Sequence, residues 1–242
     1  MKTALFEIIE NQPIAHDIFR MRLVGDAHGI SAPGQFVNIA LDGCFLRRPI
    51  SVSDYDDNGL TLIYKVVGRG TEKMSALRVG EMLDVMLPLG NGFTFASHQH
   101  PLVVGGGVGI APLYALAKRL KNATVVLGVR SKEDLFFERE FSALGAKVFI
   151  ATEDGTLGTK GFVTDAIREN AINFDYFYTC GPMPMMKALA AMMRPTTSGQ
   201  LSFEERMGCG FGACMGCSLQ MLSGSKRVCK DGPVFNMEDV IW

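Results

Sequence analysis

Four of the six cysteines in this 242-residue chain lie close together near its C-terminus. Cys209, Cys214, Cys217 and Cys229 follow the spacing C-x4-C-x2-C-x11-C. Structural zinc sites usually show paired short spacings, such as two C-x2-C pairs. A first gap of four residues with a distant fourth cysteine is instead the plant-type spacing of a [2Fe–2S] cluster. The spacing therefore favours these four cysteines as ligands of an iron–sulfur cluster, with zinc as the alternative.

Glycines are interleaved with these cysteines at positions 208, 210, 212 and 216. A loop that wraps a cluster must turn sharply and must point its N–H groups at sulfur atoms. Residues without a side chain permit both. The glycines thus agree with a cluster-binding loop.

Charge and hydropathy exclude several classes of protein. Lys and Arg number 24 and Asp and Glu 25, so the chain has no electrostatic footprint for nucleic acid. The N-terminus lacks the pattern of a secretory signal. The longest uncharged run, residues 101–117, holds four glycines and two prolines and predicts a strand, turn and helix rather than a membrane span. We expect a cytoplasmic protein, in which disulfides are rare.

The chain divides into three segments according to the order of its predicted strands and helices. Residues 1–98 read as short strands separated by turns, which indicates an antiparallel barrel or sandwich. Residues 99–200 alternate strands with helices, which predicts a parallel α/β sheet that binds ligands at the carboxyl ends of its strands. Residues 201–242 form a small cysteine-containing domain, in which the sequence predicts a hairpin at 218–229.

Two glycine-bearing strand ends in the α/β segment are candidates for nucleotide binding. The stretch GGGVGIAP places Gly105, Gly106, Gly107 and Gly109 between a strand and a helix, where backbone N–H groups suit a phosphate. The match to G-x-G-x-x-G is imperfect, and an ordinary tight turn is the alternative. A second strand end, Cys180–Pro182 with Gly181 between, favours a dinucleotide. Cys180 itself could face a nicotinamide ring or serve as a small buried residue.

The stretch FLRRPISVSD carries cations at the start of a strand. The planar fork of Arg48 suits phosphate, and Ser51 can bond a ring heteroatom. Thr71 follows a glycine at a predicted helix start, where it is a candidate N-cap. The residues alone also allow a solvated charged turn and an ordinary cap.

The motifs RRPIS, GGGVGIAP and CGP, in this order, resemble the ferredoxin–NADP reductase superfamily. The resemblance implies an antiparallel β-barrel that binds FAD in residues 1–98 and an NAD-binding domain in residues 99–200. Ile50 stands where that superfamily usually has an aromatic residue. The implied FAD contacts are Arg48, Pro49, Ile50, Ser51, Ile63, Tyr64, Lys65, Gly70 and Thr71. The implied NAD contacts are Gly105, Gly106, Gly107, Gly109, Cys180, Gly181 and Pro182.

The C-terminal stretch MGCGFGACMGC…RVCKDGPVF narrows the resemblance to the electron-transfer subunits of NAD-dependent dihydroorotate dehydrogenases. It implies a [2Fe–2S] domain in residues 201–242, ligated by the four clustered cysteines. It also implies a partner, an FMN-containing catalytic subunit, in a heterotetramer that serves pyrimidine biosynthesis. Electrons would then pass from FMN through the cluster and FAD to NAD⁺. No catalytic residue is implied in this chain beyond its cofactors, apart from Cys180 beside the nicotinamide.

Two other functions fit the same motifs. One is an FAD and [2Fe–2S] reductase subunit of another redox complex, linked to a hydrogenase, a sulfite reductase or ferredoxin. The other is a zinc-stabilised nucleotide-sensing module. The choice between NADH and NADPH also stays open, because Arg130 and Ser131 would suit a 2′-phosphate whereas Glu133 and Asp134 would repel it.

Overall fold

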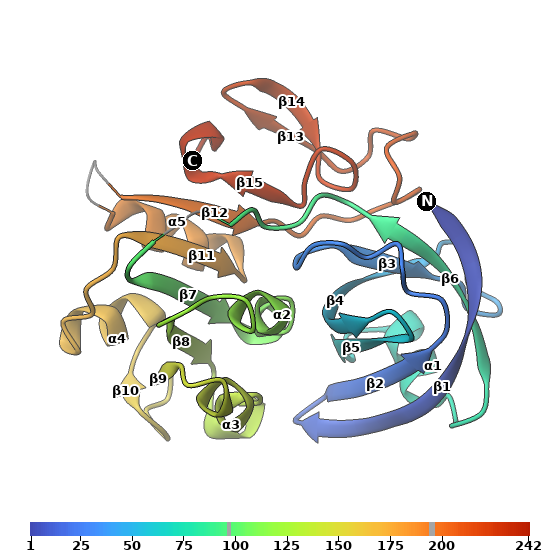
Figure 1. Ribbon diagram of the computed structural model, residues 1–242, viewed down its shortest axis with the longest axis horizontal. Coiled ribbons are helices and arrows are strands. Elements are labelled where there is room, and N and C mark those ends of the chain that lie inside the picture. Colours follow the sequence, from blue (N-terminus) through green and yellow to red (C-terminus); the bar gives the residue numbers. More distant parts are fainter. Residues whose placement is uncertain (96–97, 194–196) are drawn as a thin grey trace.

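The first third of the chain closes into a β-barrel. The computed structural model describes residues 1–95, 98–193 and 197–242, and the barrel lies at the right of Figure 1. Its strands pair antiparallel in the order β1-β2-β5-β4-β3-β6 and confirm the predicted β-barrel. They are β1 (Lys2–Ala15), β2 (Ile18–Val24), β3 (Phe36–Ile39), β4 (Arg48–Asp56), β5 (Gly59–Lys65) and β6 (Met82–Leu89).

A short helix, α1 (Arg69–Ser75), connects β5 with β6. Asn11 on β1 stabilises its end, because the Asn11 side-chain amide donates to the carbonyl groups of Met74 at 2.8 Å and Leu77 at 2.9 Å. The amide oxygen of Asn11 accepts the Tyr64 hydroxyl at 2.8 Å. One half-buried side chain thereby fixes both the helix and Tyr64 on β5.

The second part is a seven-stranded sheet, at the left of Figure 1. Its order is β10-β9-β8-β7-β11-β12-β15, and only β15 runs antiparallel to its neighbour. The chain order reverses between β7 and β11, which is the switch point where such sheets bind ligands. The strands are β7 (Pro101–Gly106), β8 (Thr124–Val129), β9 (Lys147–Thr152), β10 (Thr159–Lys160), β11 (Tyr176–Cys180), β12 (Ser198–Ser202) and β15 (Val234–Asn236).

Helices cover both faces of this sheet. Successive residues of a strand point to opposite faces, and every residue of β7 is buried, so both faces must be covered. Val103 packs with the face covered by α2 (Leu113–Ala117) and α3 (Glu138–Ala143). Val104 packs with the other face, covered by α4 (Val163–Glu169) and α5 (Met183–Ala191). The predicted parallel α/β sheet is confirmed.

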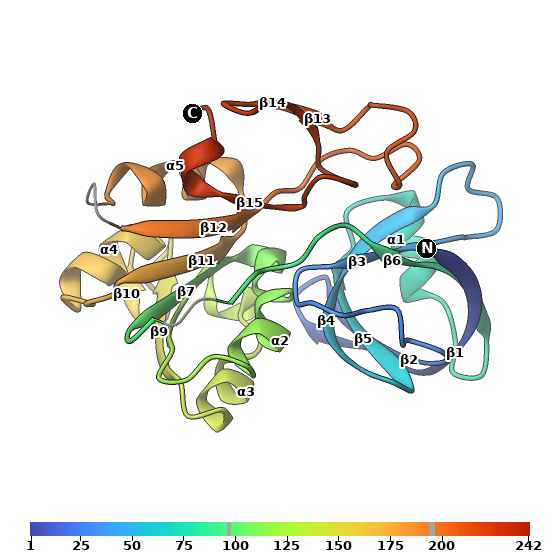
Figure 2. The ribbon, with the colours of Figure 1, turned by 45° about the horizontal axis from the view of Figure 1, so that its top comes forward.

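The C-terminal segment lies across both parts, as Figure 2 shows. After the loop that carries three of the cysteines, it forms the predicted hairpin, β13 (Ser218–Met221) and β14 (Gly224–Arg227), and then adds β15 to the sheet. Its buried residues, including Cys217, share one apolar core with Phe36 of the barrel and Leu201 of β12. The boundary proposed between residues 200 and 201 falls inside β12.

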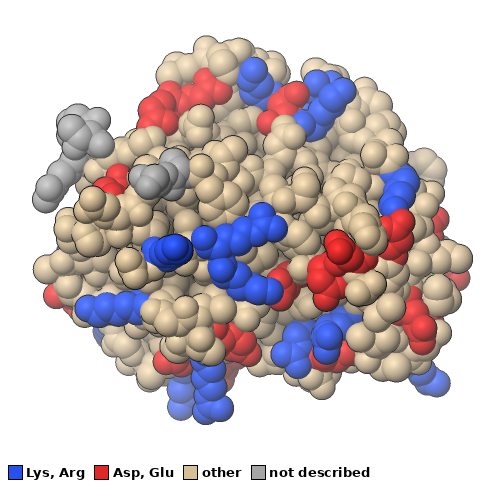
Figure 3. Space-filling view, viewed as in Figure 1, with Lys and Arg blue, Asp and Glu red and all other residues tan. Residues whose placement is uncertain are grey.

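The described surface carries charges of both signs. On the face in Figure 3, acidic and basic side chains are interspersed among uncharged ones. Among the described residues, no helix combines the length and the apolar character that crossing a bilayer requires.

Gln200 on β12 connects the sheet with the segment that leaves the barrel. Its side-chain oxygen accepts the backbone N–H of Thr94 at 2.9 Å. Its side-chain nitrogen donates to the Thr94 carbonyl at 3.0 Å and to the Tyr176 hydroxyl at 2.9 Å. With only 3% of its surface exposed, Gln200 makes these contacts in a dry environment.

We expect Gln200→Ala to lower the free energy of unfolding by about 1–3 kcal/mol, because it leaves buried partners without hydrogen bonds. Urea unfolding would measure the change. Gln220→Ala is the matched control, since Gln220 is exposed and its side chain donates, within the described part of the chain, to the adjacent Met221 carbonyl alone, at 3.4 Å. Equal midpoints for the two variants would contradict this role of Gln200.

Candidate functional site

The cysteine loop, residues 208–217, points backbone N–H groups at a thiol. The sulfur of Cys209 accepts from Phe211 at 3.5 Å, Ala213 at 3.3 Å and Cys214 at 3.4 Å. Burial alone would raise the pKa of Cys209, but the N–H groups stabilise its thiolate and lower the pKa to about 6. The loop is thus preorganised for a thiolate ligand.

The other cysteines complete two pairs. Cys209 lies within hydrogen-bonding reach of the Cys214 thiol, and Cys229 within reach of the Cys217 thiol. The backbone N–H of Cys229 donates to the Cys217 sulfur at 3.4 Å. Burial, followed by the neighbouring Cys217 thiol, raises the pKa of Cys229 to about 12. All six cysteines of the chain are free of disulfide bonds.

The four thiols are arranged as two pairs. Among the described residues, no group of three or more His, Cys, Asp or Glu side chains is placed to hold a single metal ion. Two thiol pairs, one of them receiving several N–H groups, fit the donor set of a two-iron cluster.

Side chains from the barrel hold the cysteine segment in place. The Asn38 amide on β3 donates to the carbonyl oxygen of Cys209 at 3.3 Å. The Asn91 amide, just after β6, donates to the carbonyls of Lys230 at 3.0 Å and Asp231 at 3.1 Å. The cysteine segment is therefore anchored to the barrel side at two points, one in the loop and one directly after Cys229.

A cavity of about 370 Å³, here called the flavin-side cavity, opens between the barrel, the glycine loop and the cysteine segment. It gathers every residue that the sequence predicted for FAD except Gly70. Its lining from the barrel comprises Phe36, Arg48, Pro49, Ile50, Ser51, Ile63, Tyr64, Lys65, Val67 and Thr71. Its lining from the rest of the chain comprises Val108, Ala111, Pro112, Phe203, Glu204, Glu205, Met207 and Pro233.

Arg48 and the start of α1 form the polar end of this cavity. A Cβ atom on Gly70 would lie 1.9 Å from the Arg48 Nε, so only glycine lets the arginine cross the helix start. Thr71 is the third residue of α1 rather than its N-cap, which is Gly68. The Thr71 hydroxyl accepts the N–H of Val67 at 2.9 Å. The N-cap expectation for Thr71 was wrong, because its side chain reaches back over the turn.

The Arg48 guanidinium is available for an anion. Its hydrogen bonds go to the carbonyl oxygens of Leu46 and Arg47, and among the described residues no carboxylate pairs with it. The adjacent Arg47 differs, since it forms a two-pronged ion pair with Asp84 at 3.0 and 2.9 Å. A cation facing a cavity of mixed polarity fits the phosphate and ring of a flavin nucleotide.

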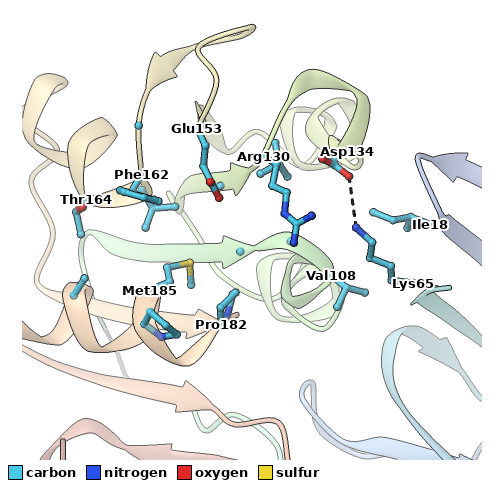
Figure 4. Close-up of a pocket in the computed structure, with 18 residues that line it drawn as sticks. Ile18, Lys65, Val108, Arg130, Asp134, Glu153, Phe162, Thr164, Pro182 and Met185 are labelled. Atoms are coloured by element: carbon cyan, nitrogen blue, oxygen red, sulfur yellow. Dashed lines mark ion pairs between the residues drawn. The ribbon is translucent and has the colours of Figure 1, made fainter. Parts of the chain in front are cut away.

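A second cavity of about 480 Å³, the nucleotide-side cavity, lies at the carboxyl ends of the sheet strands (Figure 4). Gly106, Gly107 and Pro182 line it, as predicted for NAD. Gly105 and Cys180 pair directly across β7 and β11, so the two predicted motifs meet at the switch point. The helix after the glycine loop is short, with α2 only five residues long, so its dipole contributes little.

Cys180 and Gly109 lie behind the cavity wall. A Cβ atom on Gly109 would come within 2.6 Å of the Cys180 backbone, so the loop packs directly on β11. Cys180 is 1% exposed. Burial, followed by the charge of the nearby Glu204, raises the pKa of its thiol. The contact of Cys180 with a nicotinamide stays a prediction.

Charged residues that the sequence did not assign line both cavities. Glu204 is an exposed residue that lines the flavin-side cavity, and the protein packed around its carboxyl group raises the pKa of that group. Glu153 follows β9 in the nucleotide-side cavity. Their only sequence signal was position, five residues before the first clustered cysteine for Glu204 and directly after a strand for Glu153. Arg130 and Asp134 also line that cavity, whereas Ser131 and Glu133 do not.

The two cavities adjoin. Lys65 and Val108 line both of them. The Lys65 ammonium lies 3.6 Å from an Asp134 carboxylate oxygen, an ion pair between β5 and the sheet (Figure 4). A ligand in one cavity can therefore contact a ligand in the other.

Comparison with known proteins supports each part of this arrangement. Residues 204–241 match the iron-sulfur cluster binding domain of dihydroorotate dehydrogenase B, and residues 103–191 match the oxidoreductase NAD-binding domain. A solved structure described as an NADH-dependent reduced ferredoxin-NADP oxidoreductase is 35% identical, with a TM-score of 0.90, over 99% of this chain and 90% of that one. A cytochrome P450 reductase from Amycolatopsis, 24% identical with a TM-score of 0.68, covers 81% of this chain and 68% of its own, and shares the fold.

Relatives that match along their full length define the family more closely than the domain matches do. The dihydroorotate dehydrogenase B (NAD(+)) electron transfer subunit of Geobacillus sp. (strain WCH70) is 46% identical over 100% of this chain and 99% of its own. The corresponding subunit of Fusobacterium nucleatum is 43% identical over 99% of each. At this identity and coverage, the chain belongs to the family of dihydroorotate dehydrogenase B (NAD(+)) electron transfer subunits.

Proposed function

We propose that this chain carries electrons between a dihydroorotate-oxidising catalytic subunit and NAD⁺, with FAD in the flavin-side cavity and a [2Fe–2S] cluster on Cys209, Cys214, Cys217 and Cys229. The partner in this proposal is an FMN-containing subunit, in a heterotetramer with two copies of each chain. The names of the relatives support an electron-transfer role beside a catalytic subunit.

The contiguity of the three sites carries the proposal. The nucleotide-side and flavin-side cavities share Lys65 and Val108. At its other end, the flavin-side cavity is lined by Glu205 and Met207, directly before Cys209. Nicotinamide, flavin and cluster sites thus adjoin in the order that an electron path requires.

The residues of the chain would bind and orient the FAD, the cluster and the nicotinamide, and these bound groups would carry the redox chemistry. When bound, FAD exchanges two electrons with nicotinamide and the cluster exchanges one at a time. Arg48 and the turn before Thr71 hold phosphate, while Tyr64, fixed by Asn11, forms a wall of the same cavity. The N–H groups around Cys209 stabilise negative charge on the thiolates.

A second candidate follows from the solved structure that is 35% identical, whose description names ferredoxin and NADP. The higher identity to the dihydroorotate dehydrogenase B subunits favours the first candidate. Co-expression with an FMN-containing dihydroorotate-oxidising subunit tests the choice. Dihydroorotate-dependent reduction of NAD⁺ by the purified complex is the expected result. Ferredoxin-dependent turnover without it would support the second candidate.

We expect Arg48→Ala to weaken FAD binding by about tenfold to a hundredfold, because a charged hydrogen bond contributes about 1.5–3 kcal/mol. Quenching of flavin fluorescence on titration of the apoprotein would measure the dissociation constant. Arg47→Ala is the control, since Arg47 pairs with Asp84 outside the cavity. A comparable loss of affinity in both variants would remove Arg48 from the phosphate site.

Cys214→Ser should lose iron and the passage of electrons to the partner, because a hydroxyl is a poor iron ligand. NADH should still bleach the flavin absorbance, since residue 214 lines neither cavity. Iron analysis and anaerobic spectra are the measurements, with Cys44→Ser as the control that keeps iron. Full iron content and turnover in Cys214→Ser would exclude the assigned ligand set.

Glu153→Gln should raise the ratio of NADPH to NADH use about fivefold, because a carboxylate in the cavity repels an added phosphate by about 1 kcal/mol. Glu133→Gln removes the same charge outside the cavity and should leave the ratio unchanged. Steady-state reduction of the flavin complex by each nucleotide gives the ratios. The same increase in both variants would show only an effect of net charge.

A further inference from the structure

Arg227, the last residue of β14, directs its guanidinium at the cysteine loop. Its Nη1 donates to the carbonyl oxygen of Gly212 at 3.0 Å, between Cys209 and Cys214 in the chain. Its Nε and Nη2 donate to the two carboxylate oxygens of Asp231 at 2.9 and 3.1 Å. Because a guanidinium is a rigid plane, Nη1 points away from the edge that binds Asp231. The cation therefore lies between the carboxylate and the loop.

Both charges of this pair lie close to the ligand cysteines. Arg227 and Asp231 are each two residues from Cys229 in the chain, and the Arg227 guanidinium bonds the Gly212 carbonyl inside the cysteine loop. Only 25% of the Arg227 side chain and 30% of the Asp231 side chain are exposed. Charges in such partly sheltered places interact more strongly than charges in bulk water.

We propose that Arg227 and Asp231 set the reduction potential of the cluster in opposite directions, the guanidinium raising it and the carboxylate lowering it. The inference rests on the proposed function, which places a [2Fe–2S] cluster on the four cysteines. Both residues are positioning groups for charge rather than ligands.

The direction of each effect follows from charge balance. A cluster bound by four thiolates gains one negative charge when it takes up one electron, and no bond is made or broken. A nearby cation stabilises the reduced form more than the oxidised form, and a nearby anion does the reverse. Removing the Arg227 charge also leaves Asp231 unpaired beside the loop, which lowers the potential further.

A role limited to holding the loop would give a different result. Replacing either partner breaks the same ion pair and loosens the same contact with Gly212. A structural role therefore predicts the same change in both variants. An electrostatic role predicts changes of opposite sign, which makes the two substitutions a direct test.

The experiment uses the full-length chain loaded with FAD and iron, in the variants Arg227→Gln and Asp231→Asn. Dithionite supplies the electrons, and electron paramagnetic resonance measures the fraction of reduced cluster at each solution potential. Lys230→Gln is the control, because the Lys230 side chain also lies against Gly212 but is exposed, so that solvent and salt screen its charge. Arg227→Lys keeps the charge and loses the two-pronged geometry.

At the midpoint potential of the parent protein, where half of the cluster is reduced, we expect well under half in Arg227→Gln and well over half in Asp231→Asn. Lys230→Gln and Arg227→Lys should stay near half. Shifts of the same sign, no shift, or an Arg227→Lys variant that behaves like Arg227→Gln would overturn the inference. Parent protein that binds no iron would instead refute the proposed function.

Discussion

The antiparallel pairing of β15 with β12 is the contact on which the placement of all three sites depends. β12 also pairs with β11, whose last residue is Cys180 at the nucleotide side. The residues directly after β12 line the flavin-side cavity and lead to Cys209, and Pro233, directly before β15, lines it too. One pair of short strands therefore sets the nucleotide edge, a wall of the flavin cavity and the start of the cysteine loop.

This pairing joins the barrel, the sheet and the cysteine segment through one shared apolar core. The apolar core that holds Cys217 and Cys229 also contains Phe36 of the barrel and Leu102 of the sheet. Polar side chains at its margins, Asn38 among them, bond backbone groups across the junctions. Since interiors packed in this way deform little, the separations between the sites are fixed by the fold. Fixed separations are what a chain that passes electrons between bound groups requires.

Patterns of neighbouring residues predicted the chemistry of each site. The positions of the sites relative to one another depend on strand pairing between distant parts of the chain. The spacing from Cys209 to Cys229 and the glycines at the end of β7 and directly after it are local, so the sequence alone indicated their chemistry. The strands of the barrel were predicted because short β-type runs follow one another with turn signals between them. β12 and β15 were not predicted, since they are five and three residues long and carry little periodicity. Glu204 was unassigned for the same reason, because it enters its cavity only through that pairing.

The junction of the two cavities is held by an interaction weak enough for ligands to replace. The Lys65 and Asp134 side chains are 28% and 15% exposed and their charged atoms lie 3.6 Å apart. Such a pair contributes about 1 kcal/mol or less when solvent reaches it. A phosphate of a bound nucleotide offers Lys65 a charge-assisted hydrogen bond of greater strength. An anionic ligand can therefore take the ammonium from Asp134 at small cost, while the apolar cores on either side keep the barrel and the sheet in register.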